Sequence, residues 1–173
     1  MTGSFDTGTL PALRRILLSV LVLGLVGIGA ELLLINHLES PAQIFAPALL
    51  GAGLAAVTAH LLHRGPLGVR VLQLVMVILI GTGVLGMYYH LAANLEFQRE
   101  MDPSLGGIAL LWKAMSATTP PALAPGSMAQ LGLVGLAYTF RHPAIARSHA
   151  RERPAETAVR QGDRVHERTG EAR

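Results

Sequence analysis

The stretch VLQLVMVILIGTGVLGMYYHLAA, residues 71–93, decides the fold because it contains no Asp, Glu, Lys or Arg. A helix rises about 1.5 Å per residue, so this stretch is about 34 Å long and can cross a hydrocarbon layer of about 30 Å. Inside lipid every backbone N–H and C=O group must be paired within the protein, which a helix achieves by itself. The stretch therefore predicts a membrane-spanning helix.

Three further apolar stretches flank it and predict spans at residues 16–38, 44–62 and 120–140. The last is the weakest, because Pro125 and Gly126 interrupt its beginning. We expect either a helix that starts at Pro120 and is kinked at Pro125, or a segment that enters the membrane only halfway. The chain is thus predicted to have four transmembrane helices and no strands.

The connections between the spans predict how the helices are arranged. The links at residues 39–41 and 63–68 are short and contain proline or a Gly-Pro turn, so the first three spans are expected to be antiparallel neighbours. We predict an all-α integral membrane protein built as a four-transmembrane-helix antiparallel bundle. Its predicted parts are an N-terminal segment (1–12), a membrane domain (13–141) and a disordered Arg-rich tail (142–173).

The third link, residues 94–119, is long enough to hold structure of its own. Asp102 followed by Pro103 is a typical helix start, with Asp as N-cap and Pro at the first helical position. We therefore predict an extra interfacial helix over residues 103–116, with Trp112 at the level of the lipid headgroups.

Composition excludes several classes of protein. Hydrophobic residues make up 51% of the 173 residues and charged residues 14%, whereas soluble domains carry about 25% charged residues. A soluble enzyme, a nucleic-acid-binding domain and a disordered protein are all poor fits. The chain has no cysteine, which excludes disulfides, thiolate metal sites, iron–sulfur clusters and cysteine nucleophiles.

The basic residues predict the orientation. In the four-span arrangement Arg14, Arg15, Arg64, Arg70 and the eight arginines of residues 141–173 share one side, and Arg99 and Lys113 lie on the other. The positive-inside rule then makes both termini cytoplasmic. The near-exclusive use of arginine over lysine, with abundant Ala, Gly and Leu, is typical of a GC-rich bacterial genome. We expect a multi-pass protein of the bacterial inner (plasma) membrane.

Polar residues near the outer ends of the first and third spans are the first functional candidates. They are Glu31, His37, His90, Asn94 and Glu96. An ionisable group deep in a span costs about 2.5–3.5 kcal/mol, so its presence calls for a reason. Three interpretations stay open: part of a site for zinc, manganese or iron; a Glu31–His90 pair in a proton-coupled or quinone-reactive pocket; or structural hydrogen bonds at a wet helix end. Tyr88, Tyr89 and Trp112 are expected to anchor the chain at the interface.

A second polar group is predicted near the inner ends of the spans. It contains the candidate cluster His60, His63 and Gln73, together with Ser19, Tyr138 and Thr139. A hydrogen bond between His60 and Gln73 across the Gly-Pro turn is one expected contact. A haem held by two histidines is disfavoured, because His60 and His90 lie at opposite boundaries of the membrane. His37 shares the depth of His90 but sits at a helix end beside a proline turn. A divalent metal remains the candidate cofactor, with its identity open.

The sequence carries no catalytic signature, whether a nucleotide-binding glycine loop, a nucleophile elbow or a metalloprotease helix. We therefore favour a non-enzymatic accessory, assembly or structural component that presents the outer acidic and histidine residues. The alternatives are a small metal- or proton-handling transporter and a quinone- or haem-linked membrane redox subunit. Expected partners are the lipid bilayer, a second copy of the chain through small-residue helix faces, or a larger membrane complex, and not nucleic acid.

Overall fold

The computed structural model describes residues 8–36, 41–63, 65–116 and 123–146. Within these ranges the chain forms helices and no strand. The helices are α1 (Thr9–Leu34), α2 (Pro41–His63), α3 (Pro66–Met101), α4 (Gly107–Met115) and α5 (Leu123–Thr139). The prediction of an all-helical chain is confirmed for this part.

Three helices of the described part are long and apolar enough to cross a membrane: Thr9–Leu34, Gln43–His63 and Pro66–Met101. They correspond to the first three predicted spans and agree with a membrane protein. Helix α5 has 17 residues, or about 26 Å, and is not in this group. The predicted start of the fourth span, at residue 120, lies outside the described residues.

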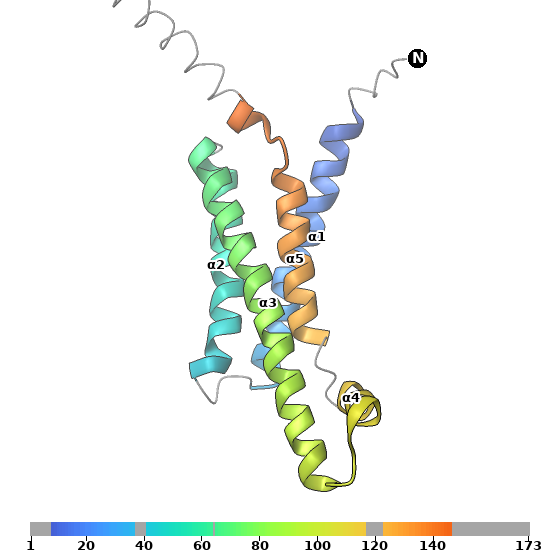
Figure 1. Ribbon diagram of the computed structural model, residues 1–173. Helices are drawn as coiled ribbons and strands as arrows, with labels where there is room; N and C mark the ends of the chain where they lie inside the picture. The colour runs from blue at the N-terminus through green and yellow to red at the C-terminus, as the bar shows by residue number, and fades with distance from the viewer. Residues whose placement is uncertain (1–7, 37–40, 64, 117–122, 147–173) are drawn as a thin grey trace, which may run out of the picture.

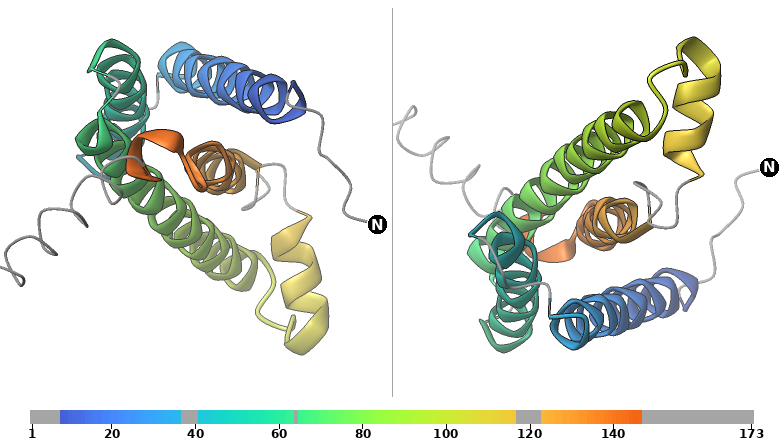
Figure 2. Two further views of the ribbon diagram at one scale, coloured as in Figure 1. Left: turned by 90° about the horizontal axis from the view of Figure 1, so that it is seen from above. Right: turned by 90° about the horizontal axis from the view of Figure 1, so that it is seen from below.

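Helices α1, α2, α3 and α5 run alternately down and up and contact one another in a closed ring (Figure 1). In this ring α2 contacts α1 and α3, and α5 contacts α3 and α1. Helix α4 contacts α3 alone among the described helices. It is seen end-on in Figure 1 and lengthwise in Figure 2, so its axis runs across the axes of the others.

The interior of the ring is apolar. Leu21 of α1, Val57 of α2, Met76 and Leu79 of α3, and Met128 of α5 are all buried in one cluster. Lipid tails are as apolar as these side chains, so in a membrane close packing rather than transfer out of water must hold such helices together. The small residues of α3 and α5 provide that packing.

Helices α3 and α5 approach backbone to backbone. A Cβ atom built at Gly83 would lie 2.5 Å from the carbonyl oxygen of Pro125 and 2.7 Å from the amide nitrogen of Ala129. One built at Gly132 would lie 2.6 Å from the carbonyl oxygen of Met76. Gly81, two residues before Gly83, faces open space. Glycine is therefore required on one face of α3 and not on its whole surface.

The end of α3 differs from the predicted end of the third span. The helix continues past residue 93 to Met101, because residues 94–101 contain helix-favouring Leu, Glu, Gln, Arg and Met and no Gly or Pro. Loss of hydrophobicity marks where a helix leaves the lipid, not where it stops. The predicted loop therefore begins eight residues later than expected.

The prediction that Asp102 starts a helix is wrong. Asp102 is instead the C-cap of α3. Its carboxylate accepts hydrogen bonds from the Ser104 hydroxyl at 2.6 Å and the Ser104 N–H at 3.1 Å. The Leu105 N–H also bonds to the Asp102 carbonyl at 3.1 Å, which closes a turn over residues 102–105 in place of a helix. Helix α4 begins at Gly107, with Gly106 as its N-cap, and not at residue 103.

The other boundaries shift by a few residues. Helix α1 begins at Thr9, ahead of the predicted residue 16, and α2 begins at Pro41. Pro125 lies in the first turn of α5, where a missing N–H breaks no helical hydrogen bond. His37 and residues 147–173 of the predicted tail lie outside the described residues.

Candidate functional site

The charged residues that the structure describes are divided between the two ends of the ring of helices. The end where α1 begins and α5 finishes carries Arg14, Arg15, Arg70 and Arg141, and we call it the basic end. All acidic residues of the described ranges, Glu31, Glu96, Glu100 and Asp102, belong to the opposite end, which we call the acidic end. Arg99 and Lys113 accompany them there.

Three aromatic rings meet at the basic end: His60 of α2, Tyr138 of α5, and His142, which follows α5. We call them the ring cluster. His60 Nε2 and the Tyr138 hydroxyl share a hydrogen bond of 3.0 Å. The His60 and His142 ring centroids are 5.1 Å apart in an edge-to-face arrangement, and those of Tyr138 and His142 are 5.8 Å apart.

Helix packing places His60 in this cluster. It lies one turn after the buried Ala56 on α2, and only 3% of its surface is exposed. A Cβ atom built at Gly68 in the first turn of α3 would lie 3.2 Å from His60 Cα, so α3 passes close behind it. The predicted partner Gln73 is half-buried on α3, and the predicted cluster member His63 is exposed. The structure joins His60 to Tyr138 rather than to Gln73.

One polar atom of the ring cluster lacks a partner. His60 Nδ1 is buried and makes no hydrogen bond with the described residues. It faces Gly68, whose built Cβ would lie 3.6 Å from it. A buried polar atom without a partner costs about 1–3 kcal/mol. Such atoms in a native fold are candidates for a functional role.

His142 was not among the residues predicted for the inner cluster. Its Nδ1 accepts a hydrogen bond of 3.3 Å from the Ala144 N–H, at the start of a helical turn over residues 143–146. The sequence signal was Pro143, because proline is typical of the first position of a helix. That signal predicts where a helical turn starts, but the contact between His142 and His60 depends on the tertiary fold.

Arg14 connects the beginning of α1 to the end of α5 by hydrogen bonds. Its Nη2 donates hydrogen bonds to the backbone carbonyls of Phe140 at 3.4 Å and Arg141 at 3.1 Å. Carbonyls at a helix C-terminus carry partial negative charge, so a guanidinium is favoured there. This contact closes the ring of helices beside the ring cluster.

At the acidic end, the predicted outer residues have separate environments. Glu31 is exposed and His90 is half-buried. The Asn94 side chain donates a hydrogen bond of 3.1 Å to the Ala114 carbonyl of α4. No group of three or more His, Asp or Glu side chains that could hold a metal ion occurs in the described ranges, which leave out His37.

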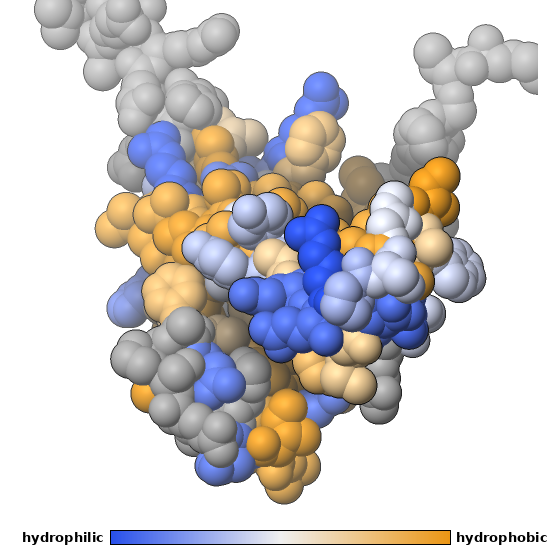
Figure 3. Space-filling model, turned by 60° about the horizontal axis from the view of Figure 1, so that its bottom comes forward, coloured by the Kyte–Doolittle hydropathy of each residue, from blue (hydrophilic) through white to orange (hydrophobic). Residues whose placement is uncertain are grey.

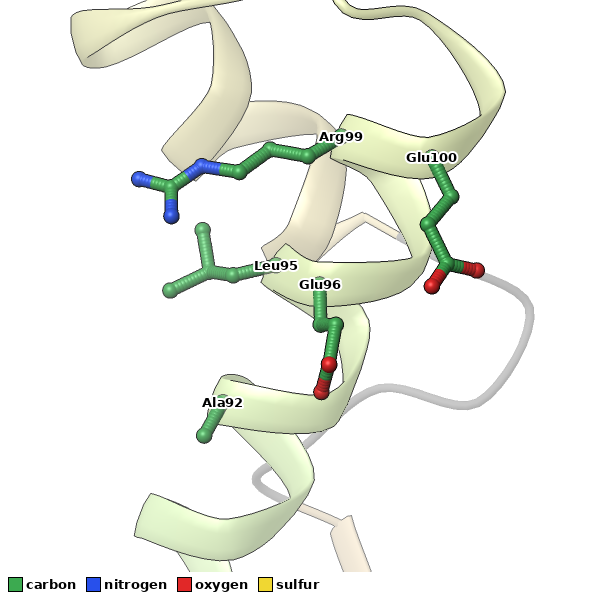
Figure 4. A pocket seen from close by; sticks show the side chains of 5 residues that line it. All are labelled: Ala92, Leu95, Glu96, Arg99 and Glu100. Atoms are coloured by element: carbon green, nitrogen blue, oxygen red, sulfur yellow. The ribbon is translucent and has the colours of Figure 1, made fainter.

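Glu96 lies on an exposed stripe of α3. This stripe lines a shallow hollow of about 510 Å³ formed by Ala92, Leu95, Glu96, Arg99 and Glu100. Figure 4 shows Leu95 and Arg99 extending to one side of the helix and Glu100 extending away from them. The hollow is therefore an open helix surface with charges of both signs.

The interfacial residues predicted from the sequence are exposed. Tyr88, Tyr89 and Trp112 each expose more than half of their surface. Leu110 and Ala114 are the buried residues of α4, while Ile108 remains exposed. Seen from the acidic end, hydrophilic residues gather at the centre with hydrophobic side chains around them (Figure 3).

The turn after α3 changes the titration of Asp102. The hydrogen bond from the Ser104 hydroxyl, and then that from its N–H, hold the pKa of Asp102 below its ordinary value. A carboxylate that accepts such bonds favours its charged form. The turn after α3 is therefore arranged around an ionised Asp102 at neutral pH.

No protein-family model matches the chain, and no curated protein and no solved structure matches it either.

Proposed function

We propose that the chain is a four-span protein of the bacterial inner membrane that serves as a non-enzymatic accessory, assembly or structural component of a larger membrane complex. Its contact surface is residues 94–116, the end of α3 together with α4, which we call the outer projection. The observation that supports this proposal most strongly is the length of α3, which is one uninterrupted helix of 36 residues. That is about 54 Å, or about 24 Å more than the hydrocarbon layer.

Helix α5 is proposed as the fourth span, completing a four-helix antiparallel bundle. Support comes from its position beside α1 and α3, two helices that are long enough to cross a membrane. Met128, Leu131 and Gly135 are buried along its length. A helix packed in this way against two spanning helices shares their surroundings.

Both termini are proposed to be cytoplasmic. The described arginines Arg14, Arg15, Arg70 and Arg141 belong to the basic end, which supports a cytoplasmic assignment of that end by the positive-inside rule. The outer projection then faces the other side of the membrane. Arg99 and Lys113 are the basic residues of that region.

The outer projection has the features of a contact surface held in a fixed shape. The Asn94–Ala114 hydrogen bond and the burial of Leu110 and Ala114 support the placement of α4 against α3. Trp112 and Ile108 remain exposed. Because α4 lies across the axes of the other helices, we assign it to the membrane interface, where tryptophan is favoured. Exposed aromatic residues also dominate binding energy in protein interfaces.

The test is the size of the assembly that contains the chain, measured by native gel electrophoresis of membranes dissolved in mild detergent. The double variant Ile108→Ala/Trp112→Ala is expected to move the chain from a large complex to its own size. Loss of a central aromatic contact costs about 2 kcal/mol, or about 30-fold in affinity.

Leu23→Ala is the matched control, because Leu23 on α1 is exposed to the same 74% as Trp112 but lies away from the outer projection. It should leave the complex intact. Wild-type protein that migrates at the size of the free chain would contradict the proposal. So would a complex that survives the double variant unchanged.

A further inference from the structure

The ring cluster joins two helices whose backbones do not contact each other. Helices α2 and α5 occupy opposite corners of the ring, with α1 and α3 between them. The His60–Tyr138 hydrogen bond and the His60–His142 ring contact connect them at the basic end. We propose that the ring cluster is a proton-binding latch, closed when both imidazoles are neutral and opened by protonation of His60 or His142.

The described contacts fit neutral rings. His142 Nδ1 accepts the Ala144 N–H, so this nitrogen carries no proton of its own, and adding one would replace the acceptor with a donor. His60 Nε2 is satisfied by the Tyr138 hydroxyl. A neutral imidazole needs one donor and one acceptor, whereas an imidazolium has two N–H donors to satisfy.

A charged His60 has no acceptor for its second N–H. Its Nδ1 is buried without a partner and faces Gly68, which has no side chain to offer. An ionised group in such a place is unstable unless it is paired or reaches water. Water can reach this nitrogen only if the segments around it move apart.

The surrounding charges have the same sign. The charged and titratable groups that the neighbouring elements bring to this end are Arg14 and Arg15 from α1, His63 from α2, Arg70 from α3, and Arg141 after α5. The acidic residues of the described part all belong to the opposite end. A positive charge on either ring is therefore repelled, and the repulsion is relieved when α2 separates from α5.

The latch is independent of the proposed assembly role, because it lies at the opposite end from the outer projection. In the orientation proposed above it would respond to cytoplasmic pH. His142 also begins the turn by which the chain leaves α5. Opening would therefore break the contact between α2 and α5. It would also break the His142–Ala144 hydrogen bond that begins the turn after α5.

The test is a distance measurement between spin labels by pulsed electron paramagnetic resonance, in the full chain reconstituted into lipid. The chain has no cysteine of its own, so labels go only where they are introduced. Leu62→Cys on α2 and Ala137→Cys on α5, both exposed, report on the basic end. Phe45→Cys and Leu123→Cys, exposed on the same two helices, report on the opposite end.

Acidification from about pH 8 to about pH 5, the range in which histidine titrates, should shift the basic-end distances to longer values. The opposite-end distances should stay the same. The double variant His60→Gln/His142→Gln, which cannot be protonated at these positions, should lose the shift. His63→Gln is the matched control, since His63 lies one turn from His60 but is exposed, and it should keep the shift.

Two results overturn the latch: basic-end distances that do not change with pH in the native chain, or a shift that persists in the double glutamine variant. If that variant does not fold, Tyr138→Phe tests the latch instead, because it keeps the aromatic ring and removes the hydroxyl that binds His60. It should give longer basic-end distances already at about pH 8. A Tyr138→Phe chain with native distances and a native response to acid also overturns the proposal.

Discussion

At the scale of the residue, His60 shows how much one buried polar side chain depends on its partner. The imidazole is 3% exposed and makes its one described hydrogen bond to the Tyr138 hydroxyl. In a low-dielectric interior a lost partner is not replaced by water. The stability of the basic end should therefore respond to the loss of a single oxygen atom.

Tyr138→Phe removes that oxygen and leaves both nitrogens of His60 without a partner. We expect the free energy of unfolding to fall by about 1–3 kcal/mol, the cost of a buried unsatisfied group. The measurement is reversible unfolding in mixed micelles, followed by circular dichroism. Tyr88→Phe is the control, because Tyr88 is exposed and its loss of a hydroxyl should change little. Equal effects of the two substitutions would mean that the Tyr138 hydroxyl is not a stabilising partner of His60.

The contacts of this cluster were only partly predictable from the sequence. His60, Tyr138 and Thr139 were expected near one end because depth follows from counting residues along a helix. Rotation about the helix axis was not predictable, so Gln73 was assigned as a partner where the structure has Tyr138. The predicted outer group, with Glu31, His90 and Glu96, depends on the same unknown rotations.

At the scale of the element, α3 and α5 require glycine at particular positions. Gly83 and Gly132 lie where a Cβ would meet backbone atoms of the other helix, which cannot move aside as a flexible side chain can. Gly81 on the same helix faces open space. At Gly83 packing against α5 therefore opposes the higher helix propensity of alanine, whereas at Gly81 no neighbouring atom opposes it.

Substitution by alanine separates the two effects. Gly81→Ala should stabilise the chain by about 0.8–1.0 kcal/mol, because alanine favours the helix more than glycine does. Gly83→Ala should destabilise it by about 1–3 kcal/mol, since the added methyl group overpacks the contact with α5. Unfolding in mixed micelles measures both. A stabilised Gly83→Ala chain would mean that α3 and α5 are not in backbone contact there.

Element boundaries show a related limit. Residues 94–101 extend α3 although they are not apolar as a group, and Asp102 ends that helix rather than beginning the next one. Helix propensity favours the extension, but after Asp102 the Leu105 N–H bonds to the Asp102 carbonyl and closes a turn, so the next helix begins only at Gly107. A short acidic side chain suits either role.

At the scale of the whole molecule, charge is divided between the two ends, and the proposed orientation follows from that division. Position 9 at the start of α1 belongs to the basic end, and position 104 lies in the turn between α3 and α4. Both residues, Thr9 and Ser104, are exposed. They are suitable sites for single cysteines in a chain that has none.

A maleimide that cannot cross membranes should label Ser104→Cys in cells whose outer membrane has been made permeable and whose inner membrane is intact. Thr9→Cys should be labelled only after the inner membrane is opened, because the positive-inside rule keeps the basic end in the cytoplasm. The reverse pattern would invert the proposed orientation. Labelling of both positions while the inner membrane is intact would mean that the chain has no single orientation in the membrane.

The sequence by itself determined that the chain is helical and contains long apolar helices, because the length of an uncharged stretch and the need to pair the backbone in lipid are local properties. It also predicted at which end of its helix a residue lies. Only the tertiary structure decided that α5 lies between α1 and α3, that Gly83 and Gly132 face a neighbouring backbone, and that His60 meets Tyr138 and His142. These features depend on the rotation of each helix about its axis, which is selected by the packing of all helices together.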